Sequence, residues 1–275
     1  MRLFWAWLLV AGCYSPSPPD GIACSSGSPG TGVDKRCPES LFCSFGTCVS
    51  EVAECLPIEA GAGKLTAPRL REAPIIDGNV EDWPTCFVTV DQSTAGLVRD
   101  LNSDGKFAPG RFSIAAFDDL LYVVAEVQSV LPLGDHAIPN IFLNNAISVY
   151  VDADGDFDNA PYDTDAAQIV VDHANRTAAF RSGMGLVSVP IDSATQTSAS
   201  TFTIEMAISP SSLGRTTFTD TIGFDIGLVG GDGEVMTSEL VWFQACTEPE
   251  CGCLGGQDSA PFCDSRQFGT AMFAP

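Results

Sequence analysis

The hydrophobic and polar positions of this chain follow a two-residue period over much of its length. The stretch from Thr201 to Met206 alternates polar and apolar side chains, and residues two apart lie on the same face of a strand. Glycine, aspartate, asparagine and proline separate such stretches, and no long window keeps a convincing helical period. The pattern predicts strands at residues 111–117, 121–128, 146–151, 166–171, 178–181, 185–189, 202–208, 222–229, 240–243 and 268–273.

Many short strands at regular spacing are typical of an antiparallel sandwich. We therefore expect an all-β fold, a jelly-roll-like antiparallel β-sandwich, over residues 71–275. Residues 57–70, which include Gly61 and Gly63, are expected to be a linker. Residues 24–56 hold five cysteines amid glycine, serine and proline. Because they offer little apolar mass for a core, we expect a small disulfide-rich module there.

The first residues are Arg2 and a short apolar run that leads into Val10-Ala11-Gly12-Cys13. This layout is typical of a secretory signal, and the run is far short of the ~20 residues that span a bilayer. The four residues resemble the lipobox of bacterial lipoproteins. The resemblance implies that residues 1–12 are removed and that Cys13 carries lipid. The alternative is an ordinary signal peptide cleaved after Gly12.

The expected lipid anchor also predicts a location. Tyr14, rather than aspartate, follows the cysteine, and in bacterial lipoproteins this usually goes with the outer membrane. Two or more acyl chains make such an anchor stable. Residues 13–23 are rich in proline and serine and would form an extended tether. We expect an exported protein on the periplasmic or cell-surface side, in contact with the membrane only through its lipid.

The chain contains 11 cysteines. Assigning Cys13 to lipid leaves an even number, and an oxidising compartment favours disulfides among them. Zinc ligation is the weaker alternative, because Cys251 and Cys253 do not form a paired knuckle and the histidines lie far away. The region from Cys37 to Cys48 resembles small modules of secreted myxobacterial proteins, which implies a stalk or spacer. The expected disulfide cysteines are Cys24, Cys37, Cys43, Cys48, Cys55, Cys86, Cys246, Cys251, Cys253 and Cys263.

The balance of 13 basic and 35 acidic residues gives a formal net charge of −22. Such a chain repels nucleic acid, so no nucleic-acid partner is expected, whereas neutral ligands and divalent cations are compatible. Halophilic adaptation is another source of such acidity. The sequence has no Gly-x-Ser-x-Gly elbow, and its two histidines, His136 and His173, are far apart, so we expect no enzyme. A Cys-x-x-Cys-His motif is also absent, so no haem is expected.

The clearest candidate for a metal site is an acidic stretch directly after a predicted strand. Asp152, Asp154, Asp156 and Asp158 occupy alternate positions there. Carboxylates with this spacing can converge on a hard cation from a tight loop. The stretch therefore predicts a structural calcium site, with an exposed acidic turn as the alternative.

A second acidic stretch resembles the first half of an EF-hand loop. Asp100, Asn102 and Asp104 provide oxygen ligands at positions one, three and five, and Gly105 stands at position six. The twelfth position is Arg111, where a bidentate glutamate is needed. A turn alone is therefore favoured over a calcium site.

From residue 73 onward, the order of motifs resembles family-9 carbohydrate-binding modules. The opening contains Asp77-Gly78 and Trp83, and the next block begins with Phe117-Asp-Asp, where the family usually has tryptophan. The resemblance covers roughly residues 70–275. Its six blocks are residues 73–84, 117–127, 145–156, 202–214 and 222–227, and Trp242 with residues 268–270.

The resemblance implies a β-sandwich that binds sugars, often with structural calcium. It puts Trp242 forward as the ring that stacks on a sugar, with Glu239 and Gln244 as polar contacts. The alternative is that Trp242 belongs to the core beside Cys246. We expect a surface lipoprotein with a non-catalytic carbohydrate-binding sandwich, accessory to polysaccharide catabolism. The alternative is a structural or protein-interaction lipoprotein that has lost its sugar site, since a fold does not fix a function.

Overall fold

The computed structural model describes residues 42–44, 47–49, 59–61, 63–157, 165–181, 185–187, 189–244 and 265–274. The chain divides into two compact units, Met1–Ala53 and Glu54–Pro275. In the first unit, β1 (Phe42–Ser44) and β2 (Thr47–Val49) pair in antiparallel fashion, with Cys43 opposite Cys48. The other residues of the predicted signal, tether and cysteine-rich module lie outside the described residues, as do Cys13, Cys24, Cys37, Cys55, Cys246, Cys251, Cys253 and Cys263.

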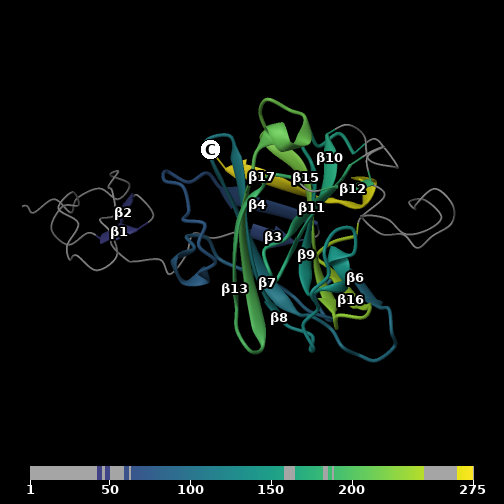
Figure 1. Cartoon of the computed structure of the whole chain (residues 1–275). Helices are drawn as coiled ribbons and strands as arrows, with labels where there is room; N and C mark the ends of the chain where they lie inside the picture. Colours follow the sequence, from purple (N-terminus) through teal and green to yellow (C-terminus); the bar gives the residue numbers. More distant parts are fainter. Residues whose placement is uncertain are drawn as a thin grey trace, which may run out of the picture. The chain divides into compact units, whose positions relative to one another are not determined.

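The second unit consists of two β-sheets packed around one hydrophobic core (Figure 1). The larger sheet has the order β12-β11-β10-β9-β15-β17-β4-β3, and β16 joins β15 to β6. Its strands are β3 (Glu59–Gly61), β4 (Lys64–Pro68), β6 (Leu97–Asp100), β9 (Ala146–Asp152), β10 (Ala166–Asp172), β11 (Thr177–Arg181), β12 (Gly185–Val187), β15 (Thr221–Gly231), β16 (Met236–Val241) and β17 (Gly269–Ala274). We call it the ten-stranded sheet.

The smaller, five-stranded sheet has the order β13-β14-β8-β7-β5. Its strands are β5 (Val88–Val90), β7 (Gly110–Phe117), β8 (Leu120–Gln128), β13 (Asp192–Thr197) and β14 (Thr201–Ile208). The helical elements among the described residues are short 3-10 turns: η1 (Val80–Asp82), η2 (Ile141–Leu143), η3 (Pro210–Leu213) and η5 (Ser265–Gln267). None of the helices in this part of the chain has the length and apolar character needed to cross a membrane.

Alternation along the strands builds the core. In β14, Phe202, Ile204 and Met206 are buried between the sheets, and in β15 Phe224 and Ile226 meet them from the other side. Burying one such side chain stabilises a fold by roughly 1.5–3 kcal/mol. The opposite positions of the same strands form the outer faces of the sheets, where the candidate sites lie.

The prediction of an all-β sandwich is confirmed, because the described unit is all-β and built from two largely antiparallel sheets. Each of the ten predicted strands overlaps an observed one, from β7 to β17. The prediction of a linker at residues 57–70 is wrong for residues 64–68. These residues form β4, with Leu65 and Ala67 buried, and β4 pairs in parallel with β17. The ten-stranded sheet is therefore mixed, since this pair is parallel while its other described pairs are antiparallel. A polar and glycine-rich stretch still contributes alternate apolar residues to the core.

The segment before β5 crosses the outer face of the five-stranded sheet. Trp83 is buried there against Tyr122 and Val124, as expected for a structural ring. The turn at Asp77 and Gly78 is fixed by Glu205, because Oε2 of this buried side chain accepts hydrogen bonds from both backbone N–H groups, at 2.8 and 2.6 Å. Gly78 has a φ of +85°, and a Cβ there would lie 2.9 Å from a backbone nitrogen. Cys86, in the same segment, is disulfide-bonded.

Candidate functional sites

Trp242 lies in the core of the sandwich. Its side chain is 9% exposed, and its ring packs against Phe112, Phe224 and Phe243 with centroid distances of 5.9, 6.4 and 6.0 Å. A Cβ on Gly269 would lie 2.6 Å from the same ring. A ring enclosed in this way has no open face for a sugar, so the geometry favours the alternative that Trp242 is a core residue.

Glu239 lies on the outer face of the ten-stranded sheet and is 2% exposed. Its Oε2 pairs with Nη1 of Arg99 at 2.7 Å, and its Oε1 accepts a hydrogen bond from the Tyr150 hydroxyl at 2.8 Å. A Cβ on Gly227 would lie 2.9 Å from Oε1, so this glycine leaves the room that the carboxylate fills. Glu239 is therefore bound within the protein, while Gln244, two residues beyond Trp242, is half-buried.

Asp225 is a second buried carboxylate beside Glu239. It lies where β15 changes partner, since β17 pairs with β15 up to Phe224 and β16 pairs with it from Gly227. Its Oδ1 accepts hydrogen bonds from the backbone N–H groups of Ile226 and Phe243, at 2.8 and 3.2 Å, while Oδ2 has no hydrogen-bond partner. Burial raises the pKa of Asp225 well above its usual range, against the hydrogen bonds, and the nearby Glu239 charge raises it further.

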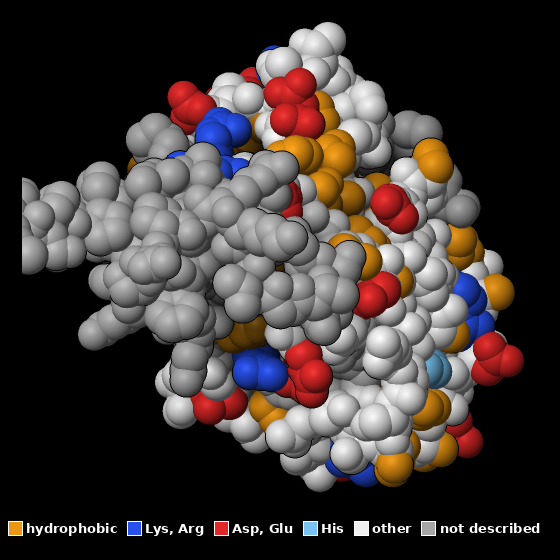
Figure 2. Space-filling model, turned by 90° about the vertical axis from the view of Figure 1, so that its left-hand side faces the viewer, with side chains coloured by type: hydrophobic (Ala, Val, Ile, Leu, Met, Phe, Trp, Pro, Cys, Tyr) orange, Lys and Arg blue, Asp and Glu red, His pale blue; other side chains and the backbone are white. Residues whose placement is uncertain are grey.

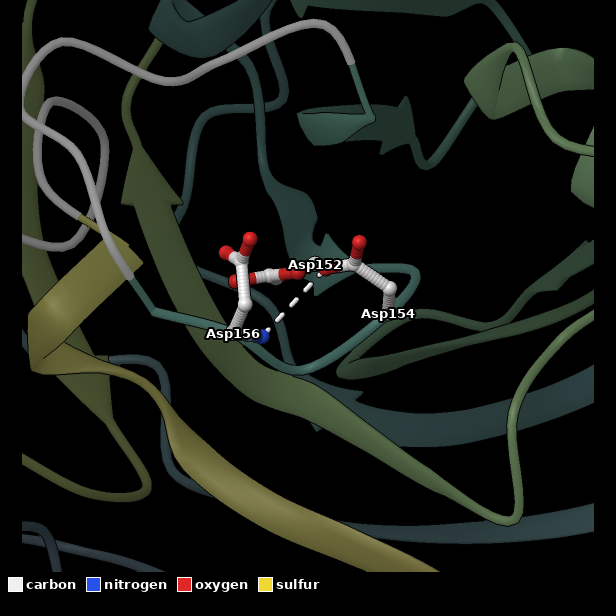
Figure 3. Close-up of side chains that lie close together, drawn as sticks. All are labelled: Asp152, Asp154 and Asp156. Atoms are coloured by element: carbon white, nitrogen blue, oxygen red, sulfur yellow. Dashed lines mark hydrogen bonds between the residues drawn. The ribbon is translucent and has the colours of Figure 1, made fainter.

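The acidic loop after β9 brings together the carboxylates of Asp152, Asp154 and Asp156, whose candidate ligand atoms lie within 4.8 Å of one another (Figure 3). Asp152 is buried, and its Oδ1 and Oδ2 accept backbone hydrogen bonds from Gly155 and Phe157, each at 3.0 Å. The backbone N–H of Asp156 donates to Oδ1 of Asp154 at 3.3 Å. The oxygen set suits a hard cation. Asp158 lies outside the described residues.

A cationic side chain already contacts this acidic loop. Arg215 pairs with Asp154, and it also pairs with Asp165 at 2.6 Å, where both Nε and Nη2 approach Oδ2. Arg215 follows the turn η3 and its C-cap Gly214, which has a φ of +79°. The loop therefore carries a counter-ion supplied by the chain itself, which offsets part of the repulsion between its carboxylates.

The second acidic stretch folds as an exposed turn. Asp100 accepts the Gly105 N–H at 3.3 Å, and Asp104 accepts the Lys106 N–H at 3.0 Å and pairs with the Lys106 ammonium at 3.2 Å. The backbone hydrogen bond from Lys106 lowers the pKa of Asp104. Asn102 is exposed. Among the described residues, the group of three or more metal-ligating side chains is the one after β9, so the geometry here favours the turn.

Sequence reasoning missed Phe142, the most exposed aromatic side chain of the described residues, at 39%. It lies in the middle of η2, whose first residue, Ile141, is fully buried. The only signal in the sequence was an apolar triplet before two asparagines, outside any strand. Other exposed apolar side chains lie earlier on the same loop and just after Gly233, whose carbonyl bonds His136 of this loop. We define the Phe142 surface by its exposed apolar residues: Leu131, Leu133, Ile138, Phe142 and Val235.

Two buried asparagines fix the loop that carries Phe142. Asn145 bonds the backbone of Val130 through both its Oδ1 and Nδ2, each at 2.7 Å, and its Nδ2 also donates to the Gly231 carbonyl at 2.9 Å. Asn144 donates to Asp172 at 2.7 Å and bonds the backbone of His136 in both directions. Hydrogen bonds from buried side chains thus hold the backbone of the loop that carries Phe142, which favours a pre-formed surface.

The other side chains that reach the surface are mixed in kind. The side of the molecule in Figure 2 shows hydrophobic side chains gathered beside scattered acidic ones, with few basic groups among them.

A recess of about 500 Å³ opens where Pro74 and Ile76 pass β8 and β14. Tyr122 lines this recess, and burial, followed by the charges of Asp118 and Asp192, raises the pKa of its hydroxyl.

The two packed sheets around one hydrophobic core define a β-sandwich. The chain belongs to the carbohydrate family 9 binding domain-like family, whose model matches residues 76–274. No curated protein matches the sequence.

Two solved structures are similar in fold. One is a family 9 carbohydrate-binding module from Caldicellulosiruptor kristjanssonii in complex with glucose, with 15% identity, a TM-score of 0.54, and coverage of 77% of this chain and 95% of that one. The other is a family 9 module from the same organism with cellotriose, with 16% identity, a TM-score of 0.53, and coverage of 76% and 93%. At these identities the likeness shows the fold.

Proposed function

We propose that this protein binds neutral saccharides without transforming them. The observation that carries the proposal is the family match over residues 76–274, together with two structural relatives that hold glucose and cellotriose. The charge of −22 agrees with an uncharged ligand, because an anionic polymer would be repelled.

The Phe142 surface is the proposed sugar site. A sugar ring packs its C–H face on an exposed aromatic ring, which removes apolar area from water, and polar groups beside the ring then fix its orientation. Phe142 provides the ring. Asp135, on the same loop, pairs with Arg176 at 2.6 Å, and Arg176 is held in turn by buried Asp172. The ion pair thus orients a carboxylate on the loop that carries the ring.

Retention in gels that contain soluble polysaccharide, followed by titration with cellotriose, tests this site. We expect Phe142→Ala to weaken binding by about tenfold or more, since tenfold corresponds to about 1.4 kcal/mol. The matched control is Ile75→Ala, which removes an exposed apolar side chain (62% exposed) outside the Phe142 surface and should leave binding unchanged. Equal binding by wild type and Phe142→Ala would show that the sugar site does not include Phe142.

A specific observation supports the second candidate, a structural or protein-interaction role. Trp242 and Glu239 are both buried and packed on or bonded to other residues of the chain, so two of the three residues first expected to hold sugar are used internally. No retention on any polysaccharide, with and without calcium, would support this role over sugar binding.

Calcium at the acidic loop belongs to the same proposal. Asp152, Asp154 and Asp156 are the residues that would hold it, and it would compete with Arg215 for Asp154. A higher unfolding temperature when calcium is added to chelator-treated protein would support calcium binding. If calcium left the unfolding temperature of the wild type unchanged but raised that of Arg215→Gln, the guanidinium of Arg215 would be shown to take the place of the ion.

The proposed location rests on the lipobox-like motif that ends in Cys13. Lipid on this residue, with removal of residues 1–12, would display the sandwich from the outer membrane. Labelling of the wild type with a fatty acid, and loss of the label in Cys13→Ser, is the expected result. A labelled Cys13→Ser protein, or an unlabelled wild type cleaved after Gly12, would contradict it.

A further inference from the structure

The outer face of the five-stranded sheet carries a groove separate from the Phe142 surface. Its volume is about 530 Å³, within the range of about 300–1,000 Å³ for small-molecule sites. Strand β8 ends in the groove, and β14 begins beside it. Hydroxyl, amide and charged side chains line much of it, among them Thr89, Gln92, Arg111, Glu126, Gln128 and Thr201.

An ion pair forms the fixed part of this groove. Arg111 and Glu126 lie opposite each other on β7 and β8, with Nε 2.7 Å from Oε2. The guanidinium carbon lies 4.5 Å from the centroid of the Phe87 ring, a cation–π distance. The two side chains are 45% and 31% exposed, so a ligand can reach them. The ring and the carboxylate together hold the guanidinium in one orientation.

We propose that this groove is a second saccharide subsite, and this inference rests on the proposed function for its ligand class. One sugar hydroxyl can accept from Arg111 and donate to Glu126, and the hydroxyls and amides of Thr89, Thr201 and Gln128 provide further partners. Because the donor and acceptor are already fixed on neighbouring strands, little rotamer entropy is lost on binding.

The charges of the groove favour a neutral ligand over an anionic one. Arg111 is the cation that lines it, whereas Glu126 and Asp91 are both acidic. Asp91 is engaged by Ser93 and Thr94, whose hydrogen bonds lower its pKa. A carboxylate of an acidic sugar would therefore meet more negative than positive charge. The hydroxyls of a neutral sugar can instead accept hydrogen bonds from the cation and donate them to a carboxylate.

The groove is close enough to the Phe142 surface for one saccharide chain to contact both. Gln128 lines the groove and Leu131 belongs to the Phe142 surface. Three residues of extended chain span at most about 11 Å, so these two Cα atoms lie no farther apart than that. Two linked contacts on one ligand raise its overall affinity without any new interaction. Longer saccharides should therefore bind more tightly than short ones.

Calorimetric titration of the full chain with cellotriose and cellohexaose tests the subsite. We expect the wild type to bind cellohexaose about tenfold more tightly than cellotriose. In Arg111→Gln and in the isosteric Glu126→Gln this gain should fall to less than about twofold, with cellotriose binding unchanged. Unfolding temperatures confirm that each variant is folded.

Arg69→Gln is the matched control. Arg69 also forms an exposed ion pair, with Asp220 at 2.7 Å, and lies 5.7 Å from the Phe273 ring centroid, but it does not line the groove. The subsite would be overturned if the wild type bound cellohexaose no more tightly than cellotriose. It would also be overturned if this gain in affinity were equal in Arg111→Gln and Arg69→Gln. Loss of cellotriose binding in Phe142→Ala alone, with no length effect, would leave the proposed function standing and reject only the groove.

Discussion

Two arginine–glutamate ion pairs link neighbouring strands of this protein. They have the same N–O distance but differ in how far their side chains are exposed to solvent. Arg99–Glu239 joins β6 to β16 on the ten-stranded sheet, and Arg111–Glu126 joins β7 to β8 on the five-stranded sheet. Both N–O distances are 2.7 Å. The side chains of the first pair are 18% and 2% exposed, whereas those of the second are 45% and 31% exposed.

The difference shows that distance alone does not set the role of an ion pair. Water screens the exposed pair, so it adds about 0–1 kcal/mol to stability, and its groups remain available to a ligand. The buried pair lies in a medium of low dielectric, where an unpartnered charge is costly. Glu239 therefore stabilises the sheet and is closed to a sugar, while Arg111 and Glu126 contribute little to stability and are open to one.

The largest expected effect comes from removing the buried carboxylate. Glu239→Ala removes the buried carboxylate that pairs with Arg99 and accepts the Tyr150 hydroxyl, so we expect a loss of about 3–5 kcal/mol in the free energy of unfolding. Chemical denaturation measures it. Glu126→Ala is the matched control and should cost less than about 1 kcal/mol. Similar losses in the two variants would break the comparison.

The next effect isolates the Tyr150 hydroxyl. Tyr150→Phe removes the donor to Glu239, and because a hydrogen bond to a charged group contributes about 1.5–3 kcal/mol, we expect a loss in that range. Tyr122→Phe is the control, since Tyr122 is also buried, although it lines the recess, and its hydroxyl makes no hydrogen bond in the described structure. A loss no greater than that of Tyr122→Phe would mean that Glu239 is satisfied without Tyr150.

A pH profile sharpens the comparison between buried and exposed carboxylates. The raised pKa of Asp225 means that the folded state holds its proton more tightly than the unfolded state, so stability falls as pH rises above about 4 toward the folded pKa. Asp225→Asn should flatten this fall in unfolding temperature. Asp104 has a lowered pKa, so its contribution is present at higher pH and is lost as pH falls. Asp104→Asn should therefore change the unfolding temperature only at acidic pH. If the unfolding temperatures of the two variants depended on pH in the same way, the opposite pKa shifts of Asp225 and Asp104 would be contradicted.

The smallest expected effect is the stability change in the exposed pair. Arg111→Gln should alter the free energy of unfolding by less than about 1 kcal/mol, and added salt should reduce even that difference. Urea denaturation at low and high salt measures it. A large, salt-independent loss would mean that Arg111 acts mainly through its packing on Phe87.

Much of the fold could be predicted from the sequence because half-buried strands alternate. β14 and β15 show this alternation clearly, and both were predicted. β13 was missed because Asp192–Thr197 is an edge strand that buries few side chains and so carries no apolar period. β4 was taken for a linker because its partner β17 lies at the far end of the domain, and no local signal shows that pairing.

The site residues were harder to predict, because exposure depends on contacts between distant segments. Trp242 matched the expected type of residue for a sugar site, yet Phe112 and Phe224 enclose it. Glu239 is closed by Arg99, which lies in another strand. Phe142 is exposed on a loop that Asn144 and Asn145 tie to distant segments by hydrogen bonds. The acidic loop after β9 was found because its carboxylates are close in sequence.

The parallel pairing of β4 with β17 also sets an order for folding. Lys64 to Pro68 leave the ribosome early, but their partners, Thr270 to Ala274, are synthesised only after nearly all of the domain. Until β17 docks, β4 and the Thr221–Phe224 part of β15 both present unpaired edges, which are prone to aggregate. The domain can complete its larger sheet only after residues 270–274 have emerged, so a chaperone that shields these edges would raise the yield of folded protein.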